Sequence, residues 1–272
     1  MTWAPQLEAV GRIASSEERI AQYTRLLEHA LHDTPSASLP SLVRTYVDGA
    51  VLDPVNTTGA GLLVGRHMLA HLATQLAAAH IPANILCTIV SDTLATCEAS
   101  SIMGDDELGP WRVLLAEQYA SLSRWRDAAQ ALQSITPHAA RRIPQLSFAQ
   151  LCVRVVELWL HDLPSHVAEA EQAIKRANSA ILDERDNKAL VHELWSYHAR
   201  VLAIQHRFME AAARYMDLPH ADMHAAVYAI ISPPSAQRTS MLTRLAQRAS
   251  AWPFAQTLHH AAEGRFLRPA DL

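Results

Sequence analysis

The chain has 272 residues, of which 50% are apolar and 18% are charged, and its formal net charge is -4. This mildly acidic balance argues against sequence-independent binding of nucleic acid, which needs a basic surface to neutralise phosphates. The nearest approach to a basic cluster is Arg141-Arg142, which we interpret as a solvated edge. Glycine is scarce while alanine and leucine are plentiful, which favours helix over strand. We expect an all-helical protein with almost no strand, as one elongated domain or two smaller ones.

The cysteines and the apolar segments indicate a reduced protein outside the membrane. Cys87, Cys97 and Cys152 form neither a disulfide framework nor a CxxC metal motif, and they fit reduced thiols of a cytosolic or nuclear protein. Residues 67–91 contain no Asp, Glu, Lys or Arg and are long enough to span a bilayer. However, histidine, glutamine and asparagine are spread through this segment and Pro82 divides it. We therefore predict a buried helix hairpin here, and no membrane partner.

The first half of the chain contains one clear helix start and two predicted loops. Ser15 with Glu18 three residues later is a capping-box signature, followed by apolar residues at helical spacing. These apolar residues are Ile20, Tyr23, Leu27 and Leu31. The segments at about 53–61 (DPVNTTGAG) and 100–110 (SIMGDDELGP) are interpreted as polar loops, because turn-forming residues cluster in them.

A repeat with a period near 40 residues occupies the middle of the chain. In each of three copies a bulky residue is followed by a small residue three positions later and a bulky residue four positions after that. The copies are Trp125-Ala128-Leu132, Val167-Ala170-Ile174 and Phe208-Ala211-Tyr215, and each follows another apolar helical stretch, the first of which contains Tyr119. Such spacing forms one helix face, on which the small residue lets a neighbouring helix approach closely.

Two helices per 40-residue unit are typical of a helical solenoid. We expect its repeat core to consist of Tyr119, Trp125, Ala128, Leu132, Ala170, Ile174, Phe208, Ala211 and Tyr215. The first hundred residues contain no clean copy, so they are either divergent repeats or a capping element.

The histidines do not form a recognisable metal motif. His67 and His71, and again His220 and His224, are spaced i, i+4, which would put each pair on one helix face. A zinc protease would need Glu directly after the first histidine, no H-x-H arrangement is present, and no cysteine lies near either pair. We interpret these histidines as surface or structurally satisfied residues, and expect no metal.

Other catalytic and cofactor motifs are also missing. Gly59-x-Gly61 superficially resembles a dinucleotide loop, but that fingerprint needs a glycine at position 64 and a preceding strand. We interpret it as a flexible entry into the following helix, and Glu17-Glu18 and Asp105-Asp106 as solvated loop or cap residues. The sequence therefore predicts no catalytic residues, no cofactor and no enzymatic activity.

Several segments between about 110 and 250 together carry a family resemblance. Residues 115–132 (LAEQYASLSRWRDAAQAL), 170–177 (AEQAIKRA), 197–218 (YHARVLAIQHRFMEAAARYMDL) and 232–245 (SPPSAQRTSMLTRL) are similar to the subunit 4 family of the COP9 signalosome. No single motif among them is diagnostic, and the likeness before residue 110 is thinner. The resemblance implies a right-handed solenoid of helix-turn-helix (TPR/HEAT-like) repeats over residues 1–185, then the helical part of a PCI domain over residues 186–272.

The resemblance also implies a function and partners. The expected protein is a non-catalytic scaffold in the nucleus and cytoplasm that contacts other signalosome subunits and a cullin–RING ligase, whereas modifier removal occurs on a different subunit. The sequence stops at Leu272, before the winged helix that usually closes a PCI module, so we expect weak assembly with other PCI subunits. The alternatives are another PCI or TPR-like adaptor, such as a proteasome-lid or initiation-factor subunit, and an enzyme or metal binder with an unrecognised site.

Overall fold

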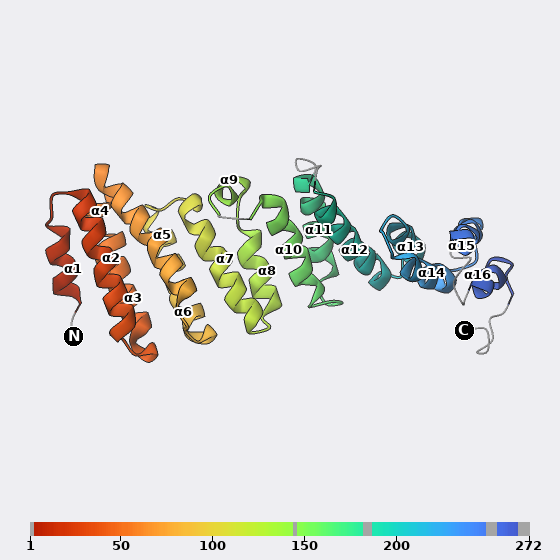
Figure 1. Ribbon diagram of the computed structural model, residues 1–272, viewed down its shortest axis with the longest axis horizontal. Helices are drawn as coiled ribbons and strands as arrows, with labels where there is room; N and C mark the ends of the chain where they lie inside the picture. Colours follow the sequence, from red (N-terminus) through yellow and green to blue (C-terminus); the bar gives the residue numbers. More distant parts are fainter. Residues whose placement is uncertain (1–2, 144–145, 182–186, 249–254, 266–272) are drawn as a thin grey trace. The chain divides into compact units, whose positions relative to one another are not determined.

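The computed structural model describes residues 3–143, 146–181, 187–248 and 255–265, and these residues form helices, turns and connecting segments without any strand. The expectation of an all-helical protein is therefore confirmed. The chain divides into two compact units, Met1–Leu151 and Cys152–Leu272. Figure 1 labels the helices of both units. The sequence predicted a different boundary, between residues 185 and 186, which separates the repeat solenoid from the helical part of a PCI domain. The division into compact units does not test that boundary, so it stays a prediction.

In the first unit, several helices pack against helices that do not directly follow them along the chain. Helix α2 packs against α5, α3 packs against α6, and α7 contacts α5, α6, α8 and α9. Trp111 of α7 is fully buried, and its indole Nε1–H donates to the carbonyl oxygen of Leu69 in α5 at 3.3 Å. The helices are α1 Ala4–Gly11, α2 Ser16–Asp33, α3 Leu39–Tyr46, α4 Pro54–Thr57, α5 Leu62–Ala78, α6 Ala83–Ser100, α7 Asp105–Ser121, α8 Trp125–Gln133 and α9 Pro137–Ala140.

In the second unit each helix from α11 to α16 packs against the next one along the chain. Its buried cluster contains many alanines, because neighbouring helices approach closely where side chains are small. The helices are α11 Val167–Ile181, α12 Lys188–Ile204, α13 Phe208–Met216, α14 Asp222–Ile231, α15 Ala236–Arg248 and α16 Ala255–Ala262; α10, Phe148–Leu160, includes the residues at which the chain is divided.

The predicted helix start at Ser15, with one of the two hydrogen bonds of a capping box, and the predicted break at Pro82 are both present. The Ser15 hydroxyl accepts a hydrogen bond from the Glu18 amide, and α2 begins at the next residue. Helix α5 ends at Ala78, and Pro82 is the N-cap of α6. Helix α5 packs mainly against α2, and helix α6 packs mainly against α7 and then α3, rather than α5 and α6 packing against each other as a hairpin would. No helix in the described part of the chain is long and apolar enough to cross a membrane.

The segment 53–61 is a tightly packed helical turn, so its interpretation as a polar loop is wrong. It contains α4 and a 3₁₀ turn, and Asn56 is fully buried. The Gly61 interpretation as a flexible entry is also wrong, since a Cβ added there would lie 1.9 Å from the Val55 carbonyl oxygen. Gly65 is similarly constrained, because its Cβ would lie 2.7 Å from the Val51 carbonyl oxygen. These glycines are required for close packing against α5.

The segment 100–110 was also predicted as a loop, but α7 already begins at Asp105. Three acidic residues in its first turn stabilise the positive end of the helix. The Glu107 side chain caps this end by accepting from the Gly104 amide at 3.0 Å. Pro110 therefore lies inside the helix, where it costs one backbone hydrogen bond that the local caps and the packing of α7 offset.

We expect Gly61→Ala to lower the free energy of unfolding by about 3 kcal/mol, because the new methyl group meets a backbone carbonyl that cannot move aside cheaply. The matched control is Gly59→Asn. Gly59 has a φ of 56° and no atom within 4 Å of an added Cβ, and asparagine tolerates this conformation. Urea unfolding of both variants measures the difference, and equal losses would contradict the packing argument.

Candidate functional site

Among the residues that the structure describes, no three His, Cys, Asp or Glu side chains are grouped as a metal ion would require. His67 is exposed and His71 is half-buried on α5. The expectation that His220 and His224 share a helix face is wrong, because α14 begins only at Asp222. His224 instead stacks on Tyr215, with ring centroids 5.1 Å apart.

All three cysteines are buried free thiols. Desolvation raises the pKa of Cys97 and of Cys152 to about 11, and it also raises the pKa of Cys87. A thiol with a raised pKa stays protonated at neutral pH and is a poor nucleophile or metal ligand. These cysteines act as small apolar core residues.

The residues of the predicted repeat core lie at equivalent places in their helices. Helices α8, α11 and α13 begin at Trp125, Val167 and Phe208, the first residue of each sequence copy. The three small residues, Ala128, Ala170 and Ala211, are each 0% exposed, and Leu132, Ile174 and Tyr215 are buried. Trp125 and Phe208 were expected to be buried but are only half-buried, as is Tyr119. Both Trp125 and Phe208 begin a helix, where the neighbouring helix covers less of the side chain.

The first and third copies also share a turn that sequence analysis missed. Ser123 and His206, two residues before their helices, have φ values of 58° and 60°. The next residue in each copy is an arginine whose Nε donates to an acidic side chain in the first helical turn. The two bonds, Arg124 to Asp127 and Arg207 to Glu210, are both 2.8 Å long. Aligning SRWRDAA with HRFMEAA would have revealed this pairing.

Arg207 also reaches Glu171 of α11, with a nitrogen-to-oxygen distance of 3.8 Å. The Arg207 guanidinium lowers the pKa of Glu210 through their hydrogen bond. His198 of α12 lies in the same environment, and its pKa is lowered by desolvation first and by Arg214 and Arg207 next. The contacts of Arg207 thus join three consecutive helices, and burial together with Arg214 and Arg207 disfavours the protonated form of His198.

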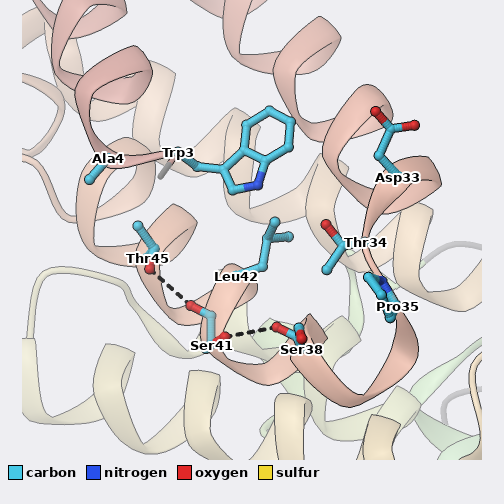
Figure 2. A pocket seen from close by; sticks show the side chains of 9 residues that line it. All are labelled: Trp3, Ala4, Asp33, Thr34, Pro35, Ser38, Ser41, Leu42 and Thr45. Carbon is cyan, nitrogen blue, oxygen red and sulfur yellow. Dashed lines mark hydrogen bonds between the residues drawn. The ribbon is translucent and has the colours of Figure 1, made fainter. Parts of the chain in front are cut away.

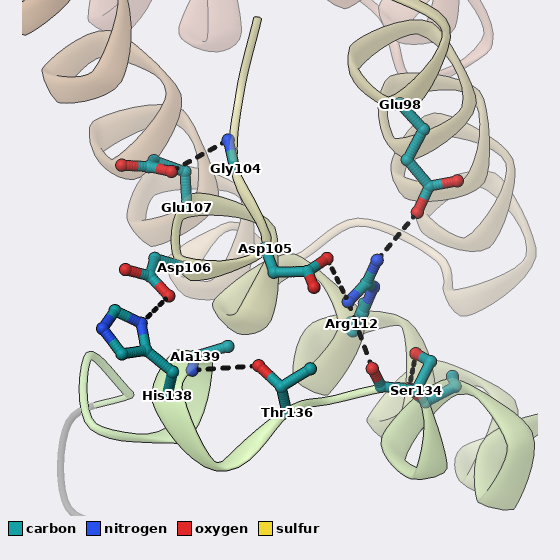
Figure 3. A network of polar contacts seen from close by, with 11 residues as sticks. Glu98, Gly104, Asp105, Asp106, Glu107, Arg112, Ser134, Thr136, His138 and Ala139 are labelled. Atoms are coloured by element: carbon teal, nitrogen blue, oxygen red, sulfur yellow. Dashed lines mark hydrogen bonds and ion pairs between the residues drawn. The ribbon is translucent and has the colours of Figure 1, made fainter. Parts of the chain in front are cut away.

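A network of ion pairs fixes the start of α7 (Figure 3). Arg112 contacts the carboxylates of Glu98 and Asp105 at 3.1 and 3.2 Å and also donates to the Ser134 carbonyl oxygen. Asp106 lies 2.6 Å from the His138 Nδ1. Asp105 and Asp106, predicted as solvated loop or cap residues, are therefore the first residues of α7, and each forms an ion pair.

Arg142 joins the same network from the end of α9. It is 3.4 Å from Asp106 and 3.2 Å from Glu107, whose carboxylate is almost fully buried and also faces Arg66 at 3.1 Å. Arg141 and Arg142 are both exposed, as the interpretation of a solvated edge predicts, and Arg142 forms these ion pairs in addition. Every acid named here has a cationic partner, so the arrangement stabilises the helix junction rather than offering a free catalytic carboxylate.

A groove of about 510 Å³ opens between the N-terminus of α1, the end of α2 and the start of α3. Figure 2 shows the Trp3 indole on one side, Asp33, Thr34 and Pro35 on the other, and Leu42 between them. The remaining lining residues are Ala4, Ser38, Ser41 and Thr45. Sequence analysis did not identify this groove, because its residues come from three separate segments.

Helix α14 carries a stripe of exposed apolar side chains. Met223, Val227 and Ile231 follow one another at i, i+4 and i+8 and are 47%, 49% and 50% exposed. Residues at this spacing lie on one helix face. Exposed apolar side chains grouped on one helix face are typical of a protein–protein contact.

We expect Ala128→Leu to lower the free energy of unfolding by about 1–3 kcal/mol, because the larger side chain separates α8 from its neighbours. Ala211→Leu should have a similar effect on α13. The control is Gln130→Leu, which adds the same side chain at an exposed position of α8. Thermal unfolding measures all three, and an unchanged midpoint for both alanine variants would contradict close packing at these positions.

The lowered pKa of His198 predicts a pH dependence of stability. As the pH falls through about 6.5, the unfolded histidine takes up a proton while the folded one resists it, so the free energy of unfolding decreases. His198→Gln should weaken this decrease between about pH 7 and pH 5. Urea unfolding across this range checks the effect. Identical pH slopes for the variant and the parent protein would exclude His198 as a cause.

Comparison with curated proteins finds relatives that include three proteins of the same name. The chain is 28% identical over 260 residues to COP9 signalosome complex subunit 4 of Caenorhabditis elegans, which covers 86% of this chain and 63% of the relative. It is 25% identical over 204 and 210 residues to the proteins of the same name from Arabidopsis thaliana and Drosophila melanogaster, covering 75% of this chain and 48% of each relative. No protein-family model matches.

The chain thus spans about half to two thirds of the length of the curated relatives it matches. All three relatives carry the same subunit name, although they come from a worm, a plant and a fly. The resemblance to COP9 signalosome subunit 4 that the sequence predicted is therefore confirmed.

Proposed function

We propose that this protein is a non-catalytic scaffold subunit of the COP9 signalosome. Its role is to support the removal of a ubiquitin-like modifier from cullin–RING ligases by holding other subunits and the substrate in place. The observation that carries the proposal is the similarity to subunit 4 of this complex in three distant organisms. Since the chain spans only part of those relatives, the partners and the supported reaction belong to the proposal as well. We expect the protein in both the nucleus and the cytoplasm.

The proposed architecture suits this role. Residues 1–185 form a right-handed solenoid of helix-turn-helix repeats, and residues 186–272 form the helical part of a PCI domain. Two features support this arrangement: the packing of each helix from α11 to α16 on the next one along the chain, and the shared turns before α8 and α13. Repeats that contact only their neighbours make an extended surface, and such surfaces are used to bind other proteins.

The contact surface for other subunits includes the apolar stripe of α14. Three half-exposed apolar side chains on one helix face leave an area of surface that a partner helix or loop can cover. The alternative function is that of another PCI or TPR-like adaptor, such as a proteasome-lid or translation-initiation-factor subunit. The 40-residue helical repeat supports both possibilities, whereas the similarity to the three relatives supports only the first.

We predict that the tagged chain, expressed in cells of its own source and isolated by affinity purification, enriches the other signalosome subunits in quantitative mass spectrometry. Val227→Asp should reduce this enrichment by about tenfold, since a buried, unpaired carboxylate weakens an interface by more than 1 kcal/mol.

The matched control is Val55→Asp, because Val55 is exposed to the same degree, 50% against 49%, but lies on α4. This variant should retain the signalosome subunits. Enrichment of proteasome-lid or initiation-factor subunits instead would establish the alternative adaptor function. Equal losses for the two valine variants would exclude the α14 stripe as the contact.

A further inference from the structure

The groove shown in Figure 2 offers hydrogen-bond acceptors and a negative charge but no positive one. Among the nine described residues that line it, none is Lys, Arg or His, and Asp33 contributes a half-exposed carboxylate at the rim. The Ser41 hydroxyl donates to the Ser38 carbonyl oxygen at 2.8 Å, and the Thr45 hydroxyl donates to the Ser41 carbonyl oxygen at 2.9 Å. Because their hydrogens are engaged, these two hydroxyl oxygens remain available only as acceptors.

The end of helix α2 adds to the negative potential. This helix has 18 residues and ends at Asp33, beside the groove. The last carbonyl groups of a helix lack intrahelical partners and together carry a partial negative charge, which favours a cation at this end. His29 and His32 each place Nδ1 3.1 Å from a different Asp33 oxygen. A carboxylate has about four lone-pair sites, so Asp33 can still accept from a ligand.

The side walls of the groove are suited to a flat cation with an aliphatic stem. The half-buried Trp3 indole lines the groove and makes an edge contact with the His29 ring, with ring centroids 6.1 Å apart. Indole is the best aromatic partner for a guanidinium or ammonium group. Leu42 and Pro35 supply apolar surface for methylene groups. A guanidinium matches this setting better than an ammonium, because it is planar, stacks on aromatic rings and presents five donors to several acceptors.

We propose that this groove binds an arginine side chain carried by an extended segment of a partner protein. Charge complementarity selects the arginine, since the guanidinium reaches Asp33 and the end of α2 while it stacks on Trp3. The volume of about 510 Å³ falls within the range of ligand sites and leaves room for the residues on either side of the arginine. This inference does not depend on the proposed signalosome function.

The test uses the full chain labelled with ¹⁵N and an acetylated, amidated peptide of sequence Gly-Ser-Ala-Arg-Ala-Ser-Gly. The Trp3 indole N–H resonance, assigned with Trp3→Phe, reports on the groove directly. We expect this resonance to shift on titration with the peptide, and not with a peptide that has citrulline in place of arginine. Citrulline keeps the shape of arginine and loses its charge.

Asp33→Asn should weaken binding of the arginine peptide by about tenfold, because a charge-assisted hydrogen bond is lost. The matched control is Glu28→Gln, which removes one negative charge from an exposed position of the same helix outside the groove, and should leave the affinity unchanged. Ser38→Arg, at an exposed lining position, should also abolish binding by placing a competing guanidinium in the groove. Circular dichroism checks that each variant is folded.

Three results would overturn the proposal. Equal binding of the citrulline peptide would show that the charge is not recognised. Equal weakening by Asp33→Asn and Glu28→Gln would show only general attraction to the acidic protein. If arginine amide alone binds as tightly as the peptide, the groove takes a small cation rather than a segment of a partner protein.

Discussion

Fully buried alanines in this protein allow neighbouring helices to pack closely. Ala128, Ala170 and Ala211 have no exposed surface, and alanines make up much of the buried cluster of the second unit. A short helix cannot bury its apolar face alone, so each pair must pack against the next. The small side chains bring the helix backbones together, and the bulky residues on either side of each alanine fill the remaining space. The other features of the fold follow from keeping this spacing.

The turns before α8 and α13 also help to place the paired helices. A residue with positive φ reverses the chain, and the arginine after it pairs with an acid of the next helix. The pair before α8 and the pair before α13 have the same bond length, although their acids differ. An exposed arginine–carboxylate pair contributes little stability by itself. Its main effect is to orient the first turn of the second helix, so that its alanine reaches the crossing.

In the first sixty residues, buried hydrogen bonds between polar groups contribute to the packing of the helices. Here Arg19 is 5% exposed and donates to the Asn56 side-chain oxygen at 2.9 Å, while the Asn56 amide donates to the Ala50 carbonyl oxygen at 2.9 Å. Buried polar groups must be hydrogen-bonded to avoid a large desolvation cost. These bonds hold the segment around α4 against α2, and Gly61 and Gly65 let its backbone approach α5. Apart from this polar packing, the protein has two surfaces with different chemistry. One is the acceptor-lined groove at the end of α2, and the other is the apolar stripe on α14.

The sequence by itself determined the helical class, the start of α2, the repeated helix face of α8, α11 and α13, the break at Pro82 and the resemblance to subunit 4. These are local features, because a capping box, a proline or the spacing of apolar residues acts within one or two helical turns. Only the tertiary structure decided that 53–61 is packed, that Arg142 is ion-paired and that Trp3, Asp33 and Leu42 share a groove. Such features depend on contacts between segments far apart along the chain. Composition and periodicity do not encode these contacts, because the same pattern is compatible with several ways of stacking the helices.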